Sequence, residues 1–260
     1  MIKFNFFGDF SLNKESPTQP LKSIKKYLDK ADVNFLNLEG PILTKEQYHK
    51  DITCFSSVDS LKLIEDYNFN LISLANNHIT DFSLTGLTDT INLLKNANIH
   101  FAGAGPNLEE ALKPCEFKIK GKKFGLLSFG WETISCKIAK KNRFGVAPLI
   151  EKVVLEEIKK QKHKFDFLII SSHFGYERDI YPAPSQRAML RKFIDQGADI
   201  IIGHGPHFIQ GIEEYKNKYI VYSLGNFLFA DIKTSKFDIP WEEEARNSFI
   251  LNLTLSCLLY

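Results

Sequence analysis

Short apolar runs alternate with amphipathic stretches along the chain. The apolar runs are four to seven residues long and rich in β-branched and aromatic side chains, which is typical of strands. They cover residues 2–7, 33–38, 71–74, 123–129, 165–171, 199–203, 218–224 and 249–255. Apolar residues recur at helical spacing in 19–31, 83–97, 150–163 and 185–197, and a shorter helical pattern follows Asp59.

This order of elements predicts an α/β core with crossover helices. Strands also bunch together near residues 115–130 and 217–255, which indicates some antiparallel pairing. Pro184-Ser185 is typical of a helix start and Gly197 of a helix end. Because the chain has no fixed-period repeat, low-complexity linker or composition break, we expect one domain over residues 1–260.

The overall composition excludes several classes of partner. Of the 260 residues, 44% are hydrophobic and 25% charged, and the net charge of +2 indicates neither a nucleic-acid partner nor an anionic membrane. No apolar run approaches the roughly 18 residues of a membrane helix. The N-terminal residues show no secretory signal pattern, so we expect a cytoplasmic protein without a membrane span.

The cysteines form no C-x-x-C pair, which excludes a zinc ribbon or a thioredoxin-type motif. They are Cys54, Cys115, Cys136 and Cys257. We therefore predict free thiols.

Polar residues follow most of the predicted strands. Loops beyond the carboxyl ends of strands line the ligand crevice of open α/β sheets. The residues in these positions come almost entirely from Asp, Glu, Asn and His: Asp9, Glu39, Asn77, His78, His173, His204, His207 and Asn226. One polar residue after a strand is ordinary turn chemistry, but this series predicts a site.

Histidines and carboxylates in this series favour a metal over a purely structural role. His204 and His207 flank Gly-Pro, so they lie in a turn in which both imidazoles can face one pocket. Imidazole together with carboxylate suits zinc, iron, manganese or nickel, and carboxylates also bridge two cations. We expect one or two divalent metal ions. His49 and His163 are predicted to lie at the surface, and His100 is predicted to be a packing or turn residue.

Six segments in order resemble the motifs of the CapA family, named for poly-γ-glutamate capsule synthesis, within the calcineurin-like metallophosphoesterase superfamily. The segments are Gly8-Asp9, NLEGPI (37–42), ANNHITD (75–81), SHFGYE (172–177), GHGPHFIQGIE (203–213) and YSLGNFLF (222–229). The resemblance implies a four-layer αββα sandwich with mixed sheets and a dinuclear metal site at one edge.

The resemblance also implies roles for individual residues. Asp9 and His207 resemble ligands of the first metal, and Glu39 stands where the superfamily has its bridging aspartate. The implied ligands of the second metal are Asn77, His173 and His204. His78 resembles the non-ligand histidine that stabilises developing charge or protonates the leaving group. Ser11 stands where the wider superfamily has a histidine.

Several further residues are candidates for the surroundings of the metals. Asp81 either orients His78 or caps the helix that starts near Ser83. Arg143 and Arg178 have the chemistry to grip a phosphate or carboxylate, although each alone is more often a surface residue. Glu177 and Asn226 are the other predicted substrate-binding residues.

Three functions follow from this reading. The first is a metal-dependent phosphomonoesterase or phosphodiesterase that uses a metal-activated water on a capsule or cell-surface polysaccharide precursor. The second is an amide (γ-glutamyl) hydrolase or ligase-type enzyme of poly-γ-glutamate metabolism. The third is a non-catalytic binding protein of capsule biosynthesis. The expected partner is a small molecule, glycan or polyanion.

Overall fold

Two six-stranded sheets form the centre of the computed structural model, which describes residues 1–13, 19–45 and 52–256. The first sheet has the order β15-β1-β2-β5-β6, and β18 pairs with the first half of β1. Its strands are β1 (Ile2–Ser11), β2 (Val33–Leu38), β5 (Leu71–Ser73), β6 (His100–Ala102), β15 (Asn226–Phe229) and β18 (Leu251–Leu255). All pairs are parallel except β1–β18.

The second sheet has the order β13-β14-β12-β11-β9-β8. Its strands are β8 (Cys115–Ile119), β9 (Lys122–Gly130), β11 (Phe167–His173), β12 (Ile200–His204), β13 (Ile212–Tyr215) and β14 (Lys218–Val221). The central pairs are parallel, whereas β8–β9 and β13–β14 are antiparallel. The antiparallel pairing predicted from the bunched strands is thus confirmed.

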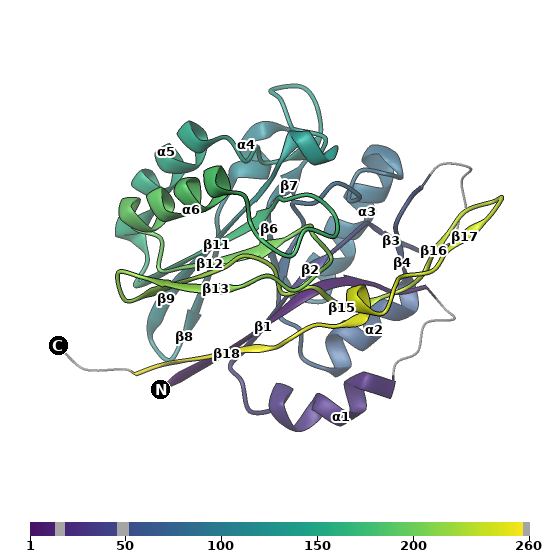
Figure 1. The fold of residues 1–260 in the computed structure, drawn as a ribbon, viewed down its shortest axis with the longest axis horizontal. Helices are drawn as coiled ribbons and strands as arrows, with labels where there is room; N and C mark the ends of the chain where they lie inside the picture. Colours follow the sequence, from purple (N-terminus) through teal and green to yellow (C-terminus); the bar gives the residue numbers. More distant parts are fainter. Residues whose placement is uncertain (14–18, 46–51, 257–260) are drawn as a thin grey trace.

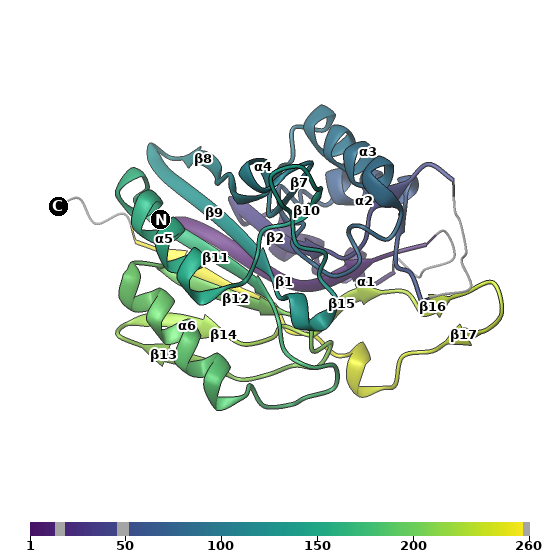
Figure 2. The same ribbon diagram turned by 90° about the horizontal axis from the view of Figure 1, so that it is seen from above.

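Helices cover the outer faces of the two sheets (Figures 1 and 2). The first sheet packs against α1 (Gln19–Leu28), α2 (Val58–Asp66) and α3 (Ser83–Asn96). The second packs against α5 (Glu151–Gln161) and α6 (Pro184–Gln196). Helix α6 begins and ends where the sequence predicts, and Gly197 follows it at φ +124°.

The inner faces of the sheets share one apolar layer. Strand side chains alternate between faces, so Ile200 and Ile202 point into this layer while Ile201 packs under the helices. Phenylalanines dominate the layer, and Phe4 of the first sheet lies 5.2 Å from Phe124 of the second, ring centre to ring centre. The predicted four-layer αββα sandwich with mixed sheets is confirmed.

Short elements complete the described chain. They are β3 (Ile42–Leu43), β4 (Ser56–Ser57), β7 (Ala104–Gly105), α4 (Leu108–Leu112), η1 (Glu132–Ile134), β10 (Gly145–Val146), η2 (Lys162–Lys164), β16 (Ile232–Lys233), β17 (Asp238–Ile239) and η3 (Glu244–Arg246). In the three described ranges, no helix has the length and apolar character needed to cross a bilayer.

The minor predictions have mixed outcomes. His163 is exposed and His100 stacks on Phe117, as expected. Cys54, Cys115 and Cys136 are free and buried. His49 and Cys257 lie outside the described residues.

Candidate metal centre

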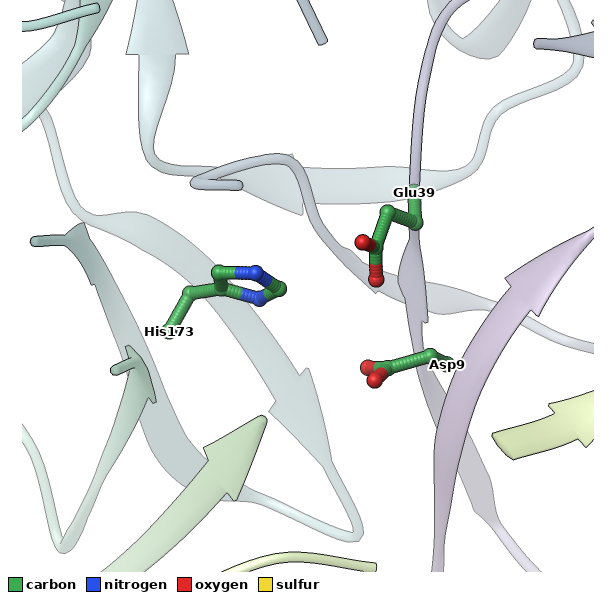
Figure 3. Close-up of side chains that lie close together, drawn as sticks. All are labelled: Asp9, Glu39 and His173. Carbon is green, nitrogen blue, oxygen red and sulfur yellow. The ribbon is translucent and has the colours of Figure 1, made fainter. Parts of the chain in front are cut away.

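The polar strand ends of the two sheets meet at one edge of the sandwich. Asp9 lies near the end of β1 and Glu39 directly after β2 in the first sheet, while His173 and His204 end β11 and β12 in the second. Figure 3 shows Asp9, Glu39 and His173 pointing toward one another from three separate elements. All of these side chains are buried.

One ligand atom from each of Asp9, Glu39 and His173 lies within 4.8 Å of the other two. His204 and His207 join this group: His204 Nδ1 donates to Asp9 Oδ1 at 2.9 Å, and His207 Nε2 lies 3.7 Å from Glu39 Oε1. Asn77 adds an amide oxygen, because its Oδ1 accepts from His173 Nε2 at 3.0 Å. The structure therefore brings together all six residues predicted as ligands.

Unpaired polar atoms in this cluster fit a cation. Among the described residues, Asp9 Oδ2, Glu39 Oε1 and His204 Nε2 are buried without a hydrogen-bond partner. Leaving such atoms unpaired costs roughly 1–3 kcal/mol each. Carboxylate and imidazole atoms are ligands for divalent transition metals, so one ion would satisfy atoms that the protein leaves bare.

The imidazole tautomers fit a metal as well. A histidine that binds a metal through one nitrogen usually donates its other ring N–H to a carboxylate or carbonyl oxygen. His204 Nδ1 donates to Asp9, and His207 Nδ1 donates to Asn226 Oδ1 at 2.8 Å. The Nε2 atom of each ring is therefore left as a lone-pair donor.

Burial and mutual charge shift the acid–base equilibria of the cluster. Burial raises the pKa of Asp9, but the hydrogen bond from His204 and the charges of His207 and His173 outweigh it and leave a pKa of about 2. Burial, reinforced by the Asp9 charge, raises the pKa of Glu39 well above its usual range. Burial also lowers the pKa of His173 to about 3. Glu39 is thus the carboxyl group of the cluster in which burial favours the protonated form.

Two buried asparagines hold the carboxylates in place. Asn37 Nδ2 donates to Asp9 Oδ1 at 2.9 Å and to Glu39 Oε2 at 3.3 Å. Asn76 Nδ2 donates to Asn37 Oδ1 at 3.2 Å and to the Leu38 carbonyl at 2.8 Å. Neither asparagine is among the predicted site residues, although both lie inside the motifs NLEGPI and ANNHITD. For Asn37, a polar residue at a buried strand position was the available signal.

Next to the cluster, His78 and Asp81 form a pair. His78 Nδ1 donates to Asp81 Oδ2 at 2.6 Å, and α3 begins after Phe82 without a side-chain cap. Asp81 therefore orients His78 and does not cap the helix. Burial lowers the pKa of His78, but contacts with the Cys54 thiol and with Asp81 raise it well above its usual range. Cys54, which the sequence reasoning treated only as a free thiol, is part of this site.

A cavity of about 460 Å³ lies against these groups. Its lining includes Asn77, His78, Asp81, His173, Glu177 and His207. Tyr176 also lines it and is half exposed, with its ring edge-on to Trp131 at 5.6 Å. Glu177, which is predicted to bind substrate, also lines this cavity.

The other three predicted substrate-binding residues have different surroundings. Arg143 is not among the described residues that line the cavity, and its guanidinium donates to the Ile138 carbonyl at 2.7 Å. Arg178 forms an ion pair with Glu242. The side chain of Asn226 is buried behind His207. Each guanidinium or amide thus serves a contact within the protein in this structure.

Ser11 is buried in β1 two residues after Asp9. Its hydroxyl donates to the Phe55 carbonyl at 3.2 Å. The position at which the superfamily resemblance implies a further imidazole is therefore filled by a side chain bonded to the neighbouring loop.

Comparison with known proteins places the chain in a family. Residues 4–231 match the family described as "Bacterial capsule synthesis protein PGA_cap". The chain belongs to this family. It is 31% identical over 227 residues to the capsule biosynthesis protein CapA of Bacillus anthracis, covering 84% of this chain and 55% of that protein. It is 32% identical over 241 residues to the PGA biosynthesis protein CapA of Bacillus subtilis (strain 168), covering 88% and 63%.

The chain therefore spans between about half and two thirds of the length of these PGA_cap relatives. Among solved structures, the NAD nucleotidase NadN of Haemophilus influenzae superposes with a TM-score of 0.50 at 14% identity, over 86% of this chain and 46% of that one. This similarity is one of fold. The PGA_cap protein described here shares its fold with part of that structure, and its candidate ligand cluster lies at one edge of the paired sheets.

Proposed function

We propose that this PGA_cap protein is a metal-dependent phosphoester hydrolase acting on a capsule or cell-surface polysaccharide precursor. One observation carries the proposal: unpaired carboxylate and imidazole atoms converge beside a histidine that is hydrogen-bonded to an aspartate. His173 and His207 of the cluster line the same cavity as that pair. The metallophosphoesterase-type fold and the capsule-synthesis family support the choice of bond and substrate class.

The two sheets contribute different types of ligand atom. Asp9 and Glu39 supply anionic oxygens from one sheet, and His173 and His204 supply nitrogens from the other, with Asn77 and His207 completing the set. A divalent cation held there acidifies water and offsets negative charge that develops on a phosphoryl group. Asn37 keeps the two carboxylates aligned through its two hydrogen bonds.

His78 serves as the proton donor to the leaving group. Its raised pKa keeps the ring protonated near neutral pH, and the bond from Nδ1 to Asp81 fixes the ring orientation. His78 lines the cavity, so a substrate bound there meets the proton-carrying ring. A protonated imidazole in this position assists the loss of an alkoxide. Such general-acid catalysis typically raises the reaction rate by 10²–10⁴-fold.

The test is hydrolysis by Mn²⁺-loaded protein of a panel with glycerol 2-phosphate, p-nitrophenyl phosphate, bis-p-nitrophenyl phosphate and γ-glutamyl p-nitroanilide. The glycerol alkoxide needs a proton to leave, whereas p-nitrophenolate does not. We expect cleavage of glycerol 2-phosphate to fall roughly 10²–10⁴-fold in His78→Ala, and cleavage of the p-nitrophenyl esters to fall less, while bound Mn²⁺ stays at the wild-type level. His163→Ala, which removes an exposed histidine, is the matched control and should match wild type. Cleavage of the anilide alone would instead establish γ-glutamyl amide chemistry.

A second candidate function is a binding protein of capsule or poly-γ-glutamate synthesis. Ser11 favours it, because its hydroxyl bonds to Phe55 where the superfamily resemblance implies a metal-binding imidazole. Mn²⁺-loaded protein that cleaves no member of the panel but binds a polysaccharide or polyglutamate fragment in the cavity would support this function.

A further inference from the structure

Residues 232–248, which follow β15 after Ala230 and Asp231, contact His207 of the candidate metal centre and are here called the strap. It begins directly after the last residue that matches the family. The strap contains β16 and β17, drawn in yellow in Figure 1. Its Trp241 reaches the cluster: the indole lies 4.7 Å from the His207 ring, centre to centre, and 5.4 Å from Phe229.

Trp241 is held by the strap and by the two residues between β15 and the strap. Its Nε1 donates to the Ala230 carbonyl at 3.0 Å, and its backbone N–H donates to Asp231 Oδ1 at 3.1 Å. Arg246 links Trp241 to Asp231, because its Nε donates to the Trp241 carbonyl at 3.0 Å and its guanidinium pairs with Asp231 at 2.6 Å. The indole is thus fixed by contacts that involve no member of the ligand cluster.

His207 needs such a support. Its φ of +61° lies in the left-handed region, which residues other than glycine rarely adopt. A residue in this region keeps its conformation only where the surroundings determine it. Asn226 bonds Nδ1 of the ring at 2.8 Å, Phe229 meets the ring edge-on at 5.3 Å, and Trp241 is the nearest of the aromatic rings that touch it.

The strap is also linked, through Arg178, to the loop that carries His207. Glu242, next to Trp241 in the chain, pairs with Arg178. The backbone N–H of Arg178 donates to the carbonyl of Pro206 at 2.9 Å, and Pro206 immediately precedes His207. The strap therefore holds His207 through its ring and through the neighbouring backbone.

We propose that Trp241 is a positioning residue for metal binding, which packs on the His207 imidazole and keeps Nε2 directed at the Glu39 carboxyl group. The contact between His207 Nε2 and Glu39 Oε1, at 3.7 Å, is the geometry that Trp241 preserves. This inference rests on the metal-binding half of the proposed function and is independent of which bond the protein cleaves.

The test measures Mn²⁺ affinity by titration calorimetry and the visible absorption of the Co²⁺-loaded protein. Removing a group that orients a ligand typically weakens metal affinity by roughly 10–100-fold, and we expect a loss of that size in Trp241→Ala. The Co²⁺ spectrum of Trp241→Ala should shift toward that of His207→Ala, because both lose the same nitrogen ligand. Trp241→Phe keeps an aromatic face against His207 and should restore most of the affinity and the wild-type spectrum.

Phe237→Ala is the matched control, since it removes a half-exposed aromatic ring from the same strap and should bind Mn²⁺ as wild type does. If Trp241→Ala fails to fold by circular dichroism, Trp241→Leu fills most of the volume without the aromatic face and should show the same loss. Wild-type affinity and spectrum in the folded variant would overturn the proposal, as would unchanged affinity in His207→Ala. A wild type that binds Mn²⁺ but hydrolyses nothing would refute only the proposed chemistry.

Discussion

Glu39 shows most clearly how a single residue shapes this site. Its carboxyl group is fully buried, one oxygen has no hydrogen-bond partner, and the other accepts from Asn37 at 3.3 Å. A buried carboxylate without a countercharge favours its protonated form. Burial and the neighbouring Asp9 accordingly raise the pKa of Glu39 well above its usual range.

We predict that Mn²⁺ binding to the chelator-treated protein releases the proton of Glu39. Because its pKa is raised, Glu39 keeps its proton to a higher pH than an exposed glutamate does, and the cation must displace that proton. Metal affinity should therefore increase as the pH rises through the range in which Glu39 titrates. Calorimetric titrations across this range, in buffers of different ionisation enthalpy, count the protons released. Glu39→Gln should release about one proton fewer than wild type. Equal proton release by the two proteins would contradict the assignment.

At the scale of the element, glycines let the strands that carry ligands pack closely. Gly8 precedes Asp9 in β1, and Gly203 precedes His204 in β12. A Cβ atom at Gly8 would lie 1.9 Å from the Gly225 carbonyl oxygen, and one at Gly203 would lie 2.1 Å from that of Tyr222. Asp9 N–H donates to the same Gly225 carbonyl at 3.0 Å, so the close approach also sets the position of Asp9.

Gly8→Ala should therefore destabilise the fold and disturb the site together. Forcing a methyl group into a packed backbone typically costs about 1–3 kcal/mol, which urea unfolding followed by circular dichroism can measure. Gly211→Ala is the control, since nothing lies within 4 Å of its added Cβ, and surface changes usually stay within about 0.5 kcal/mol. A Gly8→Ala variant as stable as Gly211→Ala would show that the strands separate without cost.

For the whole molecule, the apolar layer between the sheets aligns the two halves of the site. Phe4 contacts Phe6 in its own sheet at 5.8 Å, and Phe124 and Phe167 in the other at 5.2 and 6.2 Å. The bond between Asp9 and His204 joins the two sheets at the edge of this layer. Loss of packing between the sheets would therefore separate the ligands.

Phe4→Ala should cost about 3–5 kcal/mol in the free energy of unfolding, because it removes a fully buried ring. It should also weaken Mn²⁺ binding, although Phe4 is not a member of the ligand cluster. Phe237→Ala, at a half-exposed position, should leave both quantities unchanged.

A shared core also predicts a single domain, so circular dichroism and tryptophan fluorescence should report the same urea midpoint. Separate midpoints would contradict the single domain.

Local patterns in the sequence predict much of the fold. Alternation of apolar and polar residues locates the major strands and helices, and the end of α6 at Gly197 follows from glycine's freedom to adopt φ +124°. The polar residues after the strands identify the cluster, since strand ends in such sheets gather at one edge. These features depend on neighbours in the chain, which a sequence displays directly.

Contacts between distant segments decide the rest. Asp81 bonds to His78 and to the Cys54 backbone, Arg178 pairs with Glu242, and Asn226 lies behind His207. Residue type allowed each of these side chains a different role, as a cap, a phosphate clamp or a substrate contact. The choice follows from how two sheets pack across a layer of phenylalanines and from where the strap lies, and these contacts depend on packing between segments far apart in the chain.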